Sequence, residues 1–380
     1  MKLLVIGAGM MGSAAAYDMA RSRHVESVTL ADLEKPRVRV AVSRINRLLG
    51  TKKVTPAQLD ASRPAEGAKL MRGHTGVLSA VPYFFNLGLC RAAIDAGCHF
   101  ADLGGNNTVV RQEYELAKGA FRKNLAIAPD CGLSPGMASI LAGELMREVG
   151  GKADALKLYV GGLPEKPKPP FFYQLVFSVE GLINEYVEPA KVLRKGKVQE
   201  IEPLTELETF FLPGFEPMVA FHTSGGTSTL PETYKGKVGE CFEKTLRYPS
   251  HFELIRGLRD LGFFSSAKIR VGKAEVSPRA MTSQLFIKKM SGNEPDVTIM
   301  RIEAHNSGCI TSFTLIDHYD PATQMTAMMR TTAWPASVVL QMMCSGEISK
   351  RGAIYQELDV PARKFIEEMA ERGVKIESSI

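Results

Sequence analysis

The sequence predicts an α/β fold in which a doubly wound parallel sheet is followed by a second α+β domain with a mixed sheet. Three observations support this. The chain has 380 residues, which exceeds one ordinary domain. Short apolar runs alternate with helical patterns over residues 1–130, as in a parallel sheet. After about residue 150, strand-like runs mostly follow one another without a helix between them.

The elements of the first domain can be taken in chain order. The expected strands are Leu3–Ile6, Ser27–Ala31, Gly76–Ala80, Cys98–Ala101 and Leu125–Ala128. The expected helices between them are Ser13–Ala20, Val38–Leu49, Asn86–Ala96 and Arg111–Lys123. Strands joined by such helices form right-handed βαβ units.

In the second domain the expected strands are Leu156–Val160, Tyr173–Phe177, Lys191–Leu193, Lys268–Val271, Val297–Glu303 and Cys309–Asp317. Two late helices, Pro335–Cys344 and Pro361–Arg372, are expected to return to the first domain. We therefore place residues 1–130 and 331–380 in the first domain and residues 131–330 in the second.

Composition excludes several functional classes. No apolar run is long enough to span a bilayer, and the N-terminal apolar residues do not continue into a secretory leader. We therefore expect a cytoplasmic protein with no membrane partner. The six cysteines show no metal-ligand spacing, so no metal site is expected. A net charge of +6, spread without a basic stripe, argues against a nucleic-acid partner.

A glycine motif directly follows the first strand and opens the first helix. Gly7 permits the tight turn, Gly9 lets backbone approach a pyrophosphate, and Gly12 allows close helix packing. Asp32 lies twenty positions after Gly12, at the end of the second strand, where its carboxylate can accept hydrogen bonds from ribose hydroxyls. Its charge would repel a 2′-phosphate. The motif predicts a Rossmann domain that binds NAD, with further contacts from Met10, Met11, Ala80 and Pro82.

Polar residues also end two later strands of this domain. Asp102 follows the strand at 98–101, and Asp130 follows the strand at 125–128. Ligands bind outside the carboxyl ends of such strands, so both aspartates are candidate site residues. The alternative for either is helix capping or loop hydrogen bonding.

The second domain carries a run of small and hydroxyl residues, Phe221–Thr229, around His222. Such a loop offers hydrogen-bond donors and close backbone approach, which favours a binding site; the alternative is a solvated loop. Thr223 and Ser224 are candidate substrate contacts, as is Tyr248. Arg247 could hold a carboxylate through two hydrogen bonds, unless it is an ordinary surface arginine.

Several segments together resemble the saccharopine dehydrogenase-like family. They are VIGAGMMG, VTLAD, DLGG, PDCGLSPGM, LYVGGLP, FSVEGL, FHTSGGTSTLP, KTLRY and TTAWPASVVLQM, and they cover nearly the whole chain. Saccharopine reductases typically carry GLDPG where this sequence has Ser134 in GLSPG, and they are longer. Both departures favour a smaller amino-acid substrate. The resemblance also implies that residues 131–330 supply substrate contacts and dimer contacts, and that the protein is a homodimer or a higher homo-oligomer.

The resemblance implies NAD-dependent oxidation of the terminal amine of L-lysine to the 6-semialdehyde, with release of ammonia. This chemistry needs a base with a pKa near neutrality. His222 is the first candidate, and Asp130 is the second. Arg247 would hold the α-carboxylate, while Thr223 and Ser224 orient the substrate. The alternatives are a reductive-condensation enzyme, such as a saccharopine or carboxynorspermidine dehydrogenase, and a non-catalytic NAD-binding redox sensor.

Overall fold

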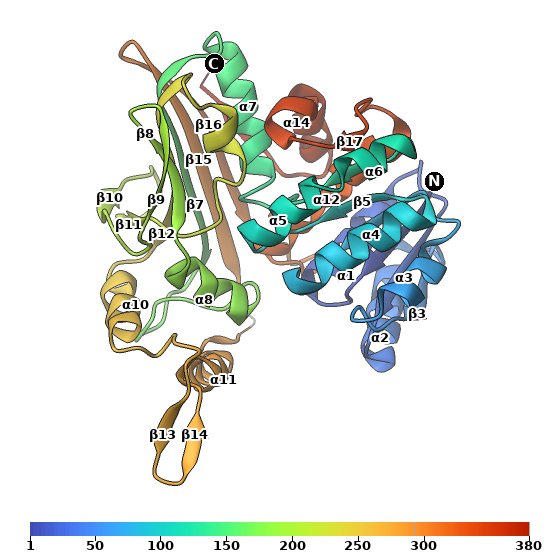
Figure 1. Cartoon of the computed structure of the whole chain (residues 1–380), viewed down its shortest axis with the longest axis horizontal. Coiled ribbons are helices and arrows are strands. Elements are labelled where there is room, and N and C mark those ends of the chain that lie inside the picture. The colour runs from blue at the N-terminus through green and yellow to red at the C-terminus, as the bar shows by residue number, and fades with distance from the viewer. Residues whose placement is uncertain (293, 380) are drawn as a thin grey trace. The chain divides into compact units, whose positions relative to one another are not determined.

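The computed structural model describes residues 1–292 and 294–379. The chain forms two compact units, each with its own sheet (Figure 1). The first comprises Met1–Arg147, Asp320–Met325 and Met329–Ile376. The second comprises Glu148–Tyr319, Thr326–Met328 and the described residues from Glu377 onward.

The first unit is built on a parallel sheet with the strand order β17-β6-β5-β4-β1-β2-β3. The strands are β1 (Lys2–Ile6), β2 (Ser27–Asp32), β3 (Val54–Gln58), β4 (Gly76–Ser79), β5 (His99–Asp102), β6 (Ala126–Ala128) and β17 (Gly352–Ala353). The order of β1 to β6 is that of a Rossmann domain, so the predicted doubly wound sheet is confirmed.

Two strands of this first unit, β3 and β17, were not expected from the sequence. In β3, Pro56 and exposed polar residues interrupt the apolar pattern, and a proline in a sheet is tolerated mainly at an edge, where β3 lies. The other strand, β17, has only two residues, too few to show a pattern. It pairs in parallel with β6 at the opposite edge of the sheet, so the chain does return to the Rossmann domain near its C-terminus.

Helices cover the buried strands of this unit. They are α1 (Met10–Arg21), α2 (Lys35–Leu49), α3 (Pro64–Met71), the 3₁₀ turn η1 (Tyr83–Phe85), α4 (Asn86–Ala96), α5 (Asn107–Tyr114), α6 (Ala117–Arg122), α7 (Met137–Glu148), α13 (Gln356–Asp359), α14 (Ala362–Glu371) and, from Met329 on, α12 (Ala327–Ser345). The helix expected at 111–123 is thus two shorter helices, α5 and α6, with a turn between them.

The first unit extends beyond residue 130, the boundary expected from the sequence, because α7 packs tightly on the returning chain. A Cβ atom on Gly143 would lie 2.1 Å from the backbone oxygen of Glu357, so only glycine permits this approach. Glu144 also pairs with Arg363 at 3.1 Å.

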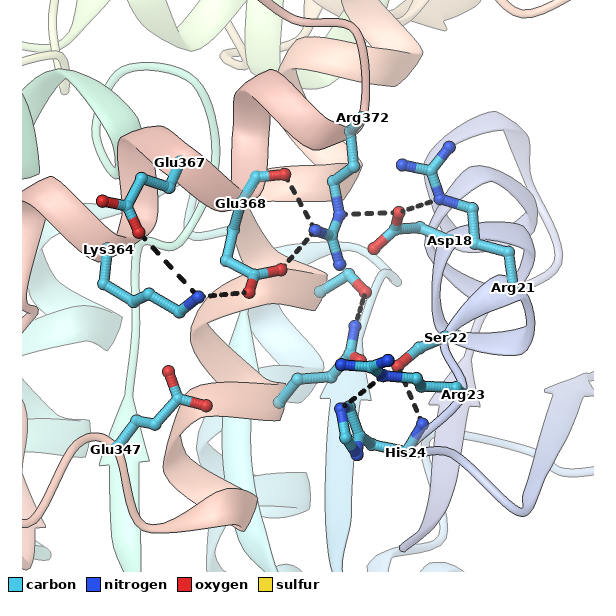
Figure 2. A network of polar contacts seen from close by, with 12 residues as sticks. Asp18, Arg21, Ser22, Arg23, His24, Glu347, Lys364, Glu367, Glu368 and Arg372 are labelled. Atoms are coloured by element: carbon cyan, nitrogen blue, oxygen red, sulfur yellow. Dashed lines mark hydrogen bonds and ion pairs between the residues drawn. The ribbon is translucent and has the colours of Figure 1, made fainter.

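An ionic cluster joins α14 to the cofactor-type helix α1 (Figure 2). The Asp18 carboxylate of α1 is fully buried. Its Oδ1 accepts hydrogen bonds from Arg372 Nε at 2.8 Å and lies 3.0 Å from Arg21 Nε. Arg372 also pairs with Glu368 of α14 at 2.6 Å. The C-terminal segment is therefore held by a buried charge as well as by apolar packing.

The second unit contains a mixed sheet with the strand order β10-β11-β12-β7-β15-β16-β18, and β8 and β9 extend it beside β12. The strands are β7 (Ala153–Pro164), β8 (Ala190–Arg194), β9 (Lys197–Ile201), β10 (Glu208–Phe210), β11 (Met218–Phe221), β12 (Val238–Arg247), β15 (Asp296–Asn306), β16 (Cys309–His318) and β18 (Ile376–Ser378). β7 and β12 run parallel, whereas their other neighbours are antiparallel, as an α+β domain requires.

The helices of this unit are α8 (Val179–Val187), α9 (Leu230–Thr233), α10 (His251–Asp260) and α11 (Pro278–Met290), and a separate hairpin, β13 (Ile269–Val271) with β14 (Ala274–Val276), projects beyond α11 (Figure 1). The strand expected at 173–177 is wrong. This segment is largely buried but forms no strand, and the Tyr173 ring packs against the Arg247 guanidinium. None of the helices among the described residues has the length and apolarity needed to cross a bilayer.

Candidate active site

The glycine turn after β1 has the geometry that the motif predicts. Gly7 adopts φ +104°, and a Cβ atom there would lie 2.5 Å from the Ala80 carbonyl oxygen, so Ala80 lies directly against the turn. A Cβ atom on Gly12 would lie 1.8 Å from the Gly7 carbonyl oxygen. Both positions therefore require glycine. The turn after β1 and the end of β4, which Pro82 follows, form one surface.

The start of α1 fits an anionic cofactor. Gly9 is the N-cap residue, and a Cβ atom on it would meet nothing within 4 Å, so this side of the turn is open. No side chain caps the helix, which leaves its first backbone N–H groups and the positive end of its dipole for a ligand. Met10 is 48% exposed beside this position, and Met11 follows it. A pyrophosphate fits this arrangement.

Asp32 lies at the end of β2 and organises the same turn. Its Oδ2 accepts a hydrogen bond from the Ala8 backbone N–H at 2.7 Å, and Oδ1 accepts one from Glu34 at 2.9 Å. Each carboxylate oxygen can accept a further bond, which suits ribose hydroxyls. Arg37, at the start of α2, lies 3.7 Å from Asp32 and is mostly exposed. A cation here would favour a 2′-phosphate, so Asp32 and Arg37 act in opposite directions on cofactor choice.

Asp102 and Asp130 lie together beyond the ends of β5 and β6. Asp102 Oδ1 accepts hydrogen bonds from the backbone N–H groups of Gly104 at 2.6 Å and Asp130 at 3.3 Å. Asp130 adopts the left-handed conformation with φ +61°, and its carbonyl oxygen accepts from Gln356 Nε2 at 2.7 Å. Gly104 must be glycine, because a Cβ atom there would lie 1.8 Å from Asp130 Oδ1. The backbone thus fixes where the Asp130 carboxyl lies.

Glu113, on α5, joins these aspartates and was missed from the sequence. It is 1% exposed, and no N–H or O–H group of another described residue donates to either of its carboxyl oxygens or to Asp102 Oδ2. Two ionised carboxylates could not bond to each other, but a protonated Glu113 donates to Asp102. Burial and the Asp102 charge raise the pKa of Glu113 to about 11, and burial raises that of Asp102 to about 6. The sequence did contain one signal that Glu113 is buried, because it lies three residues after the apolar Val110 and therefore on the same face of the helix.

This buried proton makes stability depend on pH. Glu113 is protonated when folded and titrates near 4.5 when exposed, so folding takes up a proton between these pKa values. The free energy of unfolding should therefore fall as pH rises from about 5 to about 9. We expect Glu113→Gln, which still donates to Asp102 but does not titrate, to lose less stability over this range. Urea unfolding at both pH values would measure this, with exposed Glu115→Gln as the control. An unchanged pH dependence would show that Glu113 is ionised in the fold.

In the second unit, Arg247 ends β12 and is 3% exposed, so the alternative of a surface arginine is excluded. Its guanidinium lies 4.6 Å from the centre of the Tyr173 ring, and Nη2 lies 3.6 Å from Glu185 Oε2. Nη1 donates to the Leu246 carbonyl oxygen at 2.9 Å. Burial opposes the charge, but two tyrosines and Glu185 outweigh it and raise the pKa of Arg247, so the guanidinium stays charged.

Beside Arg247, a chain of hydrogen bonds links the Phe171 carbonyl oxygen, His251 and Tyr186. His251 Nδ1 lies 2.8 Å from the Phe171 carbonyl oxygen, which can only accept, so Nδ1 carries the proton. Burial lowers the pKa of His251 to about 3, and the neutral ring therefore accepts from the Tyr186 hydroxyl through Nε2 at 3.0 Å. Because the Tyr186 hydroxyl donates its proton to His251, the lone pairs of the Tyr186 oxygen can accept a hydrogen bond from the Arg247 guanidinium.

His222 follows β11, and its ring lies on the other face of the same sheet. It packs edge-on against Phe242, whereas Glu243 and Arg247 alternate with Phe242 along β12 and point to the opposite face. Nδ1 and Nε2 both face acceptors, the Glu243 carbonyl oxygen and Glu206 Oε2, each at 3.1 Å. Burial lowers the pKa of His222 despite Glu206. The structure therefore does not bring His222 and Arg247 together, and one amino acid cannot contact both.

The loop after His222 is buried rather than solvated. Thr223 donates to Glu243 Oε2 at 3.2 Å, and Ser224 donates to the Pro189 carbonyl oxygen at 3.1 Å. Gly226 packs against the Glu243 side chain, which explains why this loop needs small residues. The Tyr248 hydroxyl donates to the Pro164 carbonyl oxygen at 2.9 Å. The hydroxyl groups expected to orient substrate are thus bonded within the unit.

Both units match domains of one family. Residues 3–129 match the saccharopine dehydrogenase NADP binding domain, and residues 132–374 match the saccharopine dehydrogenase C-terminal domain. The chain belongs to the saccharopine dehydrogenase family. The resemblance found in the sequence is confirmed at the level of the family.

Curated relatives in this family include saccharopine dehydrogenases [NADP(+), L-glutamate-forming] from Pyricularia oryzae and Schizosaccharomyces pombe. Both are 26% identical to this chain, over 65% and 78% of it. The chain spans 56% and 66% of the lengths of these relatives.

Solved structures show the same fold. Apo saccharopine dehydrogenase (L-Glu forming) from Saccharomyces cerevisiae has a TM-score of 0.78 at 17% identity, covering 100% of this chain and 99% of that one. Homospermidine synthase from Legionella pneumophila, in complex with NAD, has a TM-score of 0.71 at 11% identity, covering 99% and 90%. The match to the NADP binding domain supports a nicotinamide cofactor, and it does not decide between NAD and NADP.

Proposed function

We propose that this protein catalyses the L-lysine 6-dehydrogenase reaction, the NAD-dependent oxidation of the terminal amine of L-lysine. The observation that carries this proposal is the charge around Arg247. This buried cation lies beside the Glu185 carboxylate and a neutral His251, and burial raises the pKa of nearby Glu243 well above its ordinary value. Such a site suits an amino acid with one carboxylate and amine groups. Saccharopine carries three carboxylates, and Glu185 would repel the additional ones.

The proposed reaction requires a hydride acceptor, a base and a group that binds the α-carboxylate. The glycine turn, the start of α1 and Asp32 would hold NAD, which would supply the acceptor for a hydride from the terminal carbon of lysine. Before that step the terminal ammonium must lose a proton, because a cationic nitrogen cannot support hydride departure. Asp130 is proposed as the base that takes this proton and later activates the water that hydrates the imine. Ammonia then leaves, and the 6-semialdehyde remains and cyclises. Arg247 binds the α-carboxylate.

Asp130 is preferred to His222 as the base for two reasons. The Asp130 carboxyl lies at the carboxyl ends of the Rossmann strands, where ligands of such sheets bind. Both ring nitrogens of His222 face protein acceptors, and His222 lies on the face of its sheet away from Arg247.

A substrate panel tests the proposal. Purified protein is assayed for NADH or NADPH formation with L-lysine, pentane-1,5-diamine and saccharopine, each with NAD and with NADP. We expect turnover with lysine and NAD, and release of one ammonia for each NADH. Saccharopine oxidation without lysine oxidation would support the second candidate, a reductive-condensation enzyme, which the names of the fungal relatives favour. Cofactor binding without turnover on any amine would indicate a redox sensor.

Cofactor choice gives a further prediction. We expect the protein to prefer NAD, because Asp32 repels a 2′-phosphate at the ribose. Asp32→Asn should weaken NAD binding by about tenfold and narrow the gap to NADP, whereas Arg37→Gln should leave NAD binding nearly unchanged and weaken NADP binding. Dissociation constants of both cofactors for the three proteins would measure this. Equal use of NADP by the unchanged protein would contradict the proposed role of Asp32.

The homodimer remains a proposal that follows from the resemblance, and the cytoplasmic location remains a proposal that follows from the sequence composition. Sedimentation of the purified protein at several concentrations would test the first of them.

A further inference from the structure

Three buried polar atoms around Arg247 have no hydrogen-bond partner within residues 1–292 and 294–379. They are Arg247 Nε, Glu185 Oε2 and the Tyr173 hydroxyl. An unsatisfied buried polar group costs roughly 1–3 kcal/mol, so three together on one unit indicate groups kept for a ligand. Two of them are donors and one is an acceptor that bears negative charge.

The guanidinium presents a defined edge to this ligand. In arginine, Nε and Nη2 lie on the same edge, which can bind a carboxylate through two parallel hydrogen bonds. Nη1 is already used by the Leu246 carbonyl oxygen, whereas Nε has no partner and Nη2 is 3.6 Å from Glu185. The open edge therefore faces the Glu185 carboxylate.

Glu185 determines which ligand this edge accepts. A simple carboxylate that approached Arg247 would meet the Glu185 charge beside it and would be repelled. An amino-acid zwitterion brings its own ammonium next to its carboxylate, so Arg247 and Glu185 are each matched by an opposite charge. The site and the zwitterion are both neutral overall, which avoids burying an unpaired charge.

We propose that Arg247, Glu185 and Tyr173 form a subsite for an α-amino-acid zwitterion, in which Glu185 binds the α-ammonium and excludes simple carboxylates. This rests on the proposed function only in taking lysine as the natural ligand. The Glu185 side chain is 29% exposed, although its Oε2 atom is buried, whereas Arg247 and Tyr173 are buried as whole residues.

The charges around Glu185 give this subsite a pH dependence. Burial raises the pKa of Glu185 to about 7, although Arg247 opposes the shift. Tyr173, Tyr186, Glu243 and His251 are the other titratable groups packed around Arg247 and Glu185. An α-ammonium favours the ionised carboxylate, so zwitterion binding should weaken as pH falls below 7.

Binding of unreactive ligands tests the subsite without turnover. The full chain is titrated by calorimetry with L-norleucine, which has the zwitterion but no terminal amine, and with hexanoate, which has the carboxylate alone. We expect norleucine to bind about tenfold or more tightly than hexanoate, and the difference to shrink in Glu185→Gln. Equal binding of both ligands, or binding of neither, would overturn the proposal even if lysine is oxidised.

Turnover separates this inference from the proposed function. Glu185→Gln should lower kcat/KM about ten- to a hundredfold for lysine but not for 6-aminohexanoate, which lacks the α-amino group. Arg247→Met should impair both substrates and spare pentane-1,5-diamine. The control is Glu180→Gln, an exposed glutamate on the same helix α8. An equal loss for lysine and 6-aminohexanoate in Glu185→Gln would show that Glu185 only stabilises the fold. Should Glu185→Gln not fold, the norleucine preference of the unchanged protein still decides.

Discussion

Asp130→Asn should lower turnover by about 10²–10⁴-fold, the usual contribution of a general base, while NAD binding changes only slightly. Asparagine has the size of aspartate and also tolerates the left-handed backbone, so φ +61° at this position is preserved. The backbone hydrogen bonds to Asp102 and from Gln356 do not involve the substituted side chain. The substitution therefore removes the base with little change in structure.

Steady-state turnover with lysine, together with NAD binding, would measure this effect. His222→Gln is the matched comparison, because it removes the other candidate base from a buried position where both ring nitrogens face acceptors. We expect it to cost less than tenfold in turnover, with any loss following stability. A larger loss in His222→Gln than in Asp130→Asn would transfer the role of base to His222.

Asp18→Asn should lower the free energy of unfolding of the first unit by about 3–5 kcal/mol, the cost of breaking a buried ion pair from one side. Asp18 is fully buried, and it pairs with Arg372 of the returning segment and with Arg21 of its own helix (Figure 2). Removing its charge leaves the buried Arg372 with Glu368 alone. Because α1 carries the glycine turn, this loss should also weaken cofactor binding.

Trp334 is the single tryptophan of the chain and reports on this unit. It is 2% exposed and lies beside Arg21 and Arg330, at 4.9 and 5.0 Å from its ring centre, so its fluorescence should change when the first unit unfolds. Urea unfolding followed by this signal gives the free energy. Glu368→Gln is the control, since its partly exposed charge should contribute about 1 kcal/mol or less. Equal losses for both variants would contradict a special role for the buried Asp18.

The features that could be predicted from sequence are those that depend on local spacing. Gly7, Gly12 and Asp32 lie at fixed offsets from a strand end, and the backbone geometry at that turn leaves no other residue type possible at the two glycines. The same holds for Asp102 and Asp130, because parallel strands place their carboxyl ends at one edge. Local patterns therefore gave the Rossmann sheet and the cofactor turn.

The relation between His222 and Arg247 depends on register, which local patterns do not contain. Phe221 pairs with Thr245 across β11 and β12, and this single alignment decides that His222 and Arg247 occupy opposite faces. A shift of one residue would have placed them together. Glu113 and Glu185 were missed for a related reason. Each looks like an ordinary helical glutamate, and only the distant partners Asp102 and Arg247 make it significant.

Transfer of deuterium from lysine to the cofactor tests whether the protein oxidises the terminal carbon of lysine. The protein is incubated with NAD and L-lysine deuterated either at the terminal carbon or at the α-carbon, and the reduced cofactor is analysed by mass spectrometry. We expect deuterium in NADH only from terminally labelled lysine, with ammonia released in equal amount. Deuterium from the α-carbon, or cofactor reduction that requires a second substrate besides lysine, would contradict this expectation.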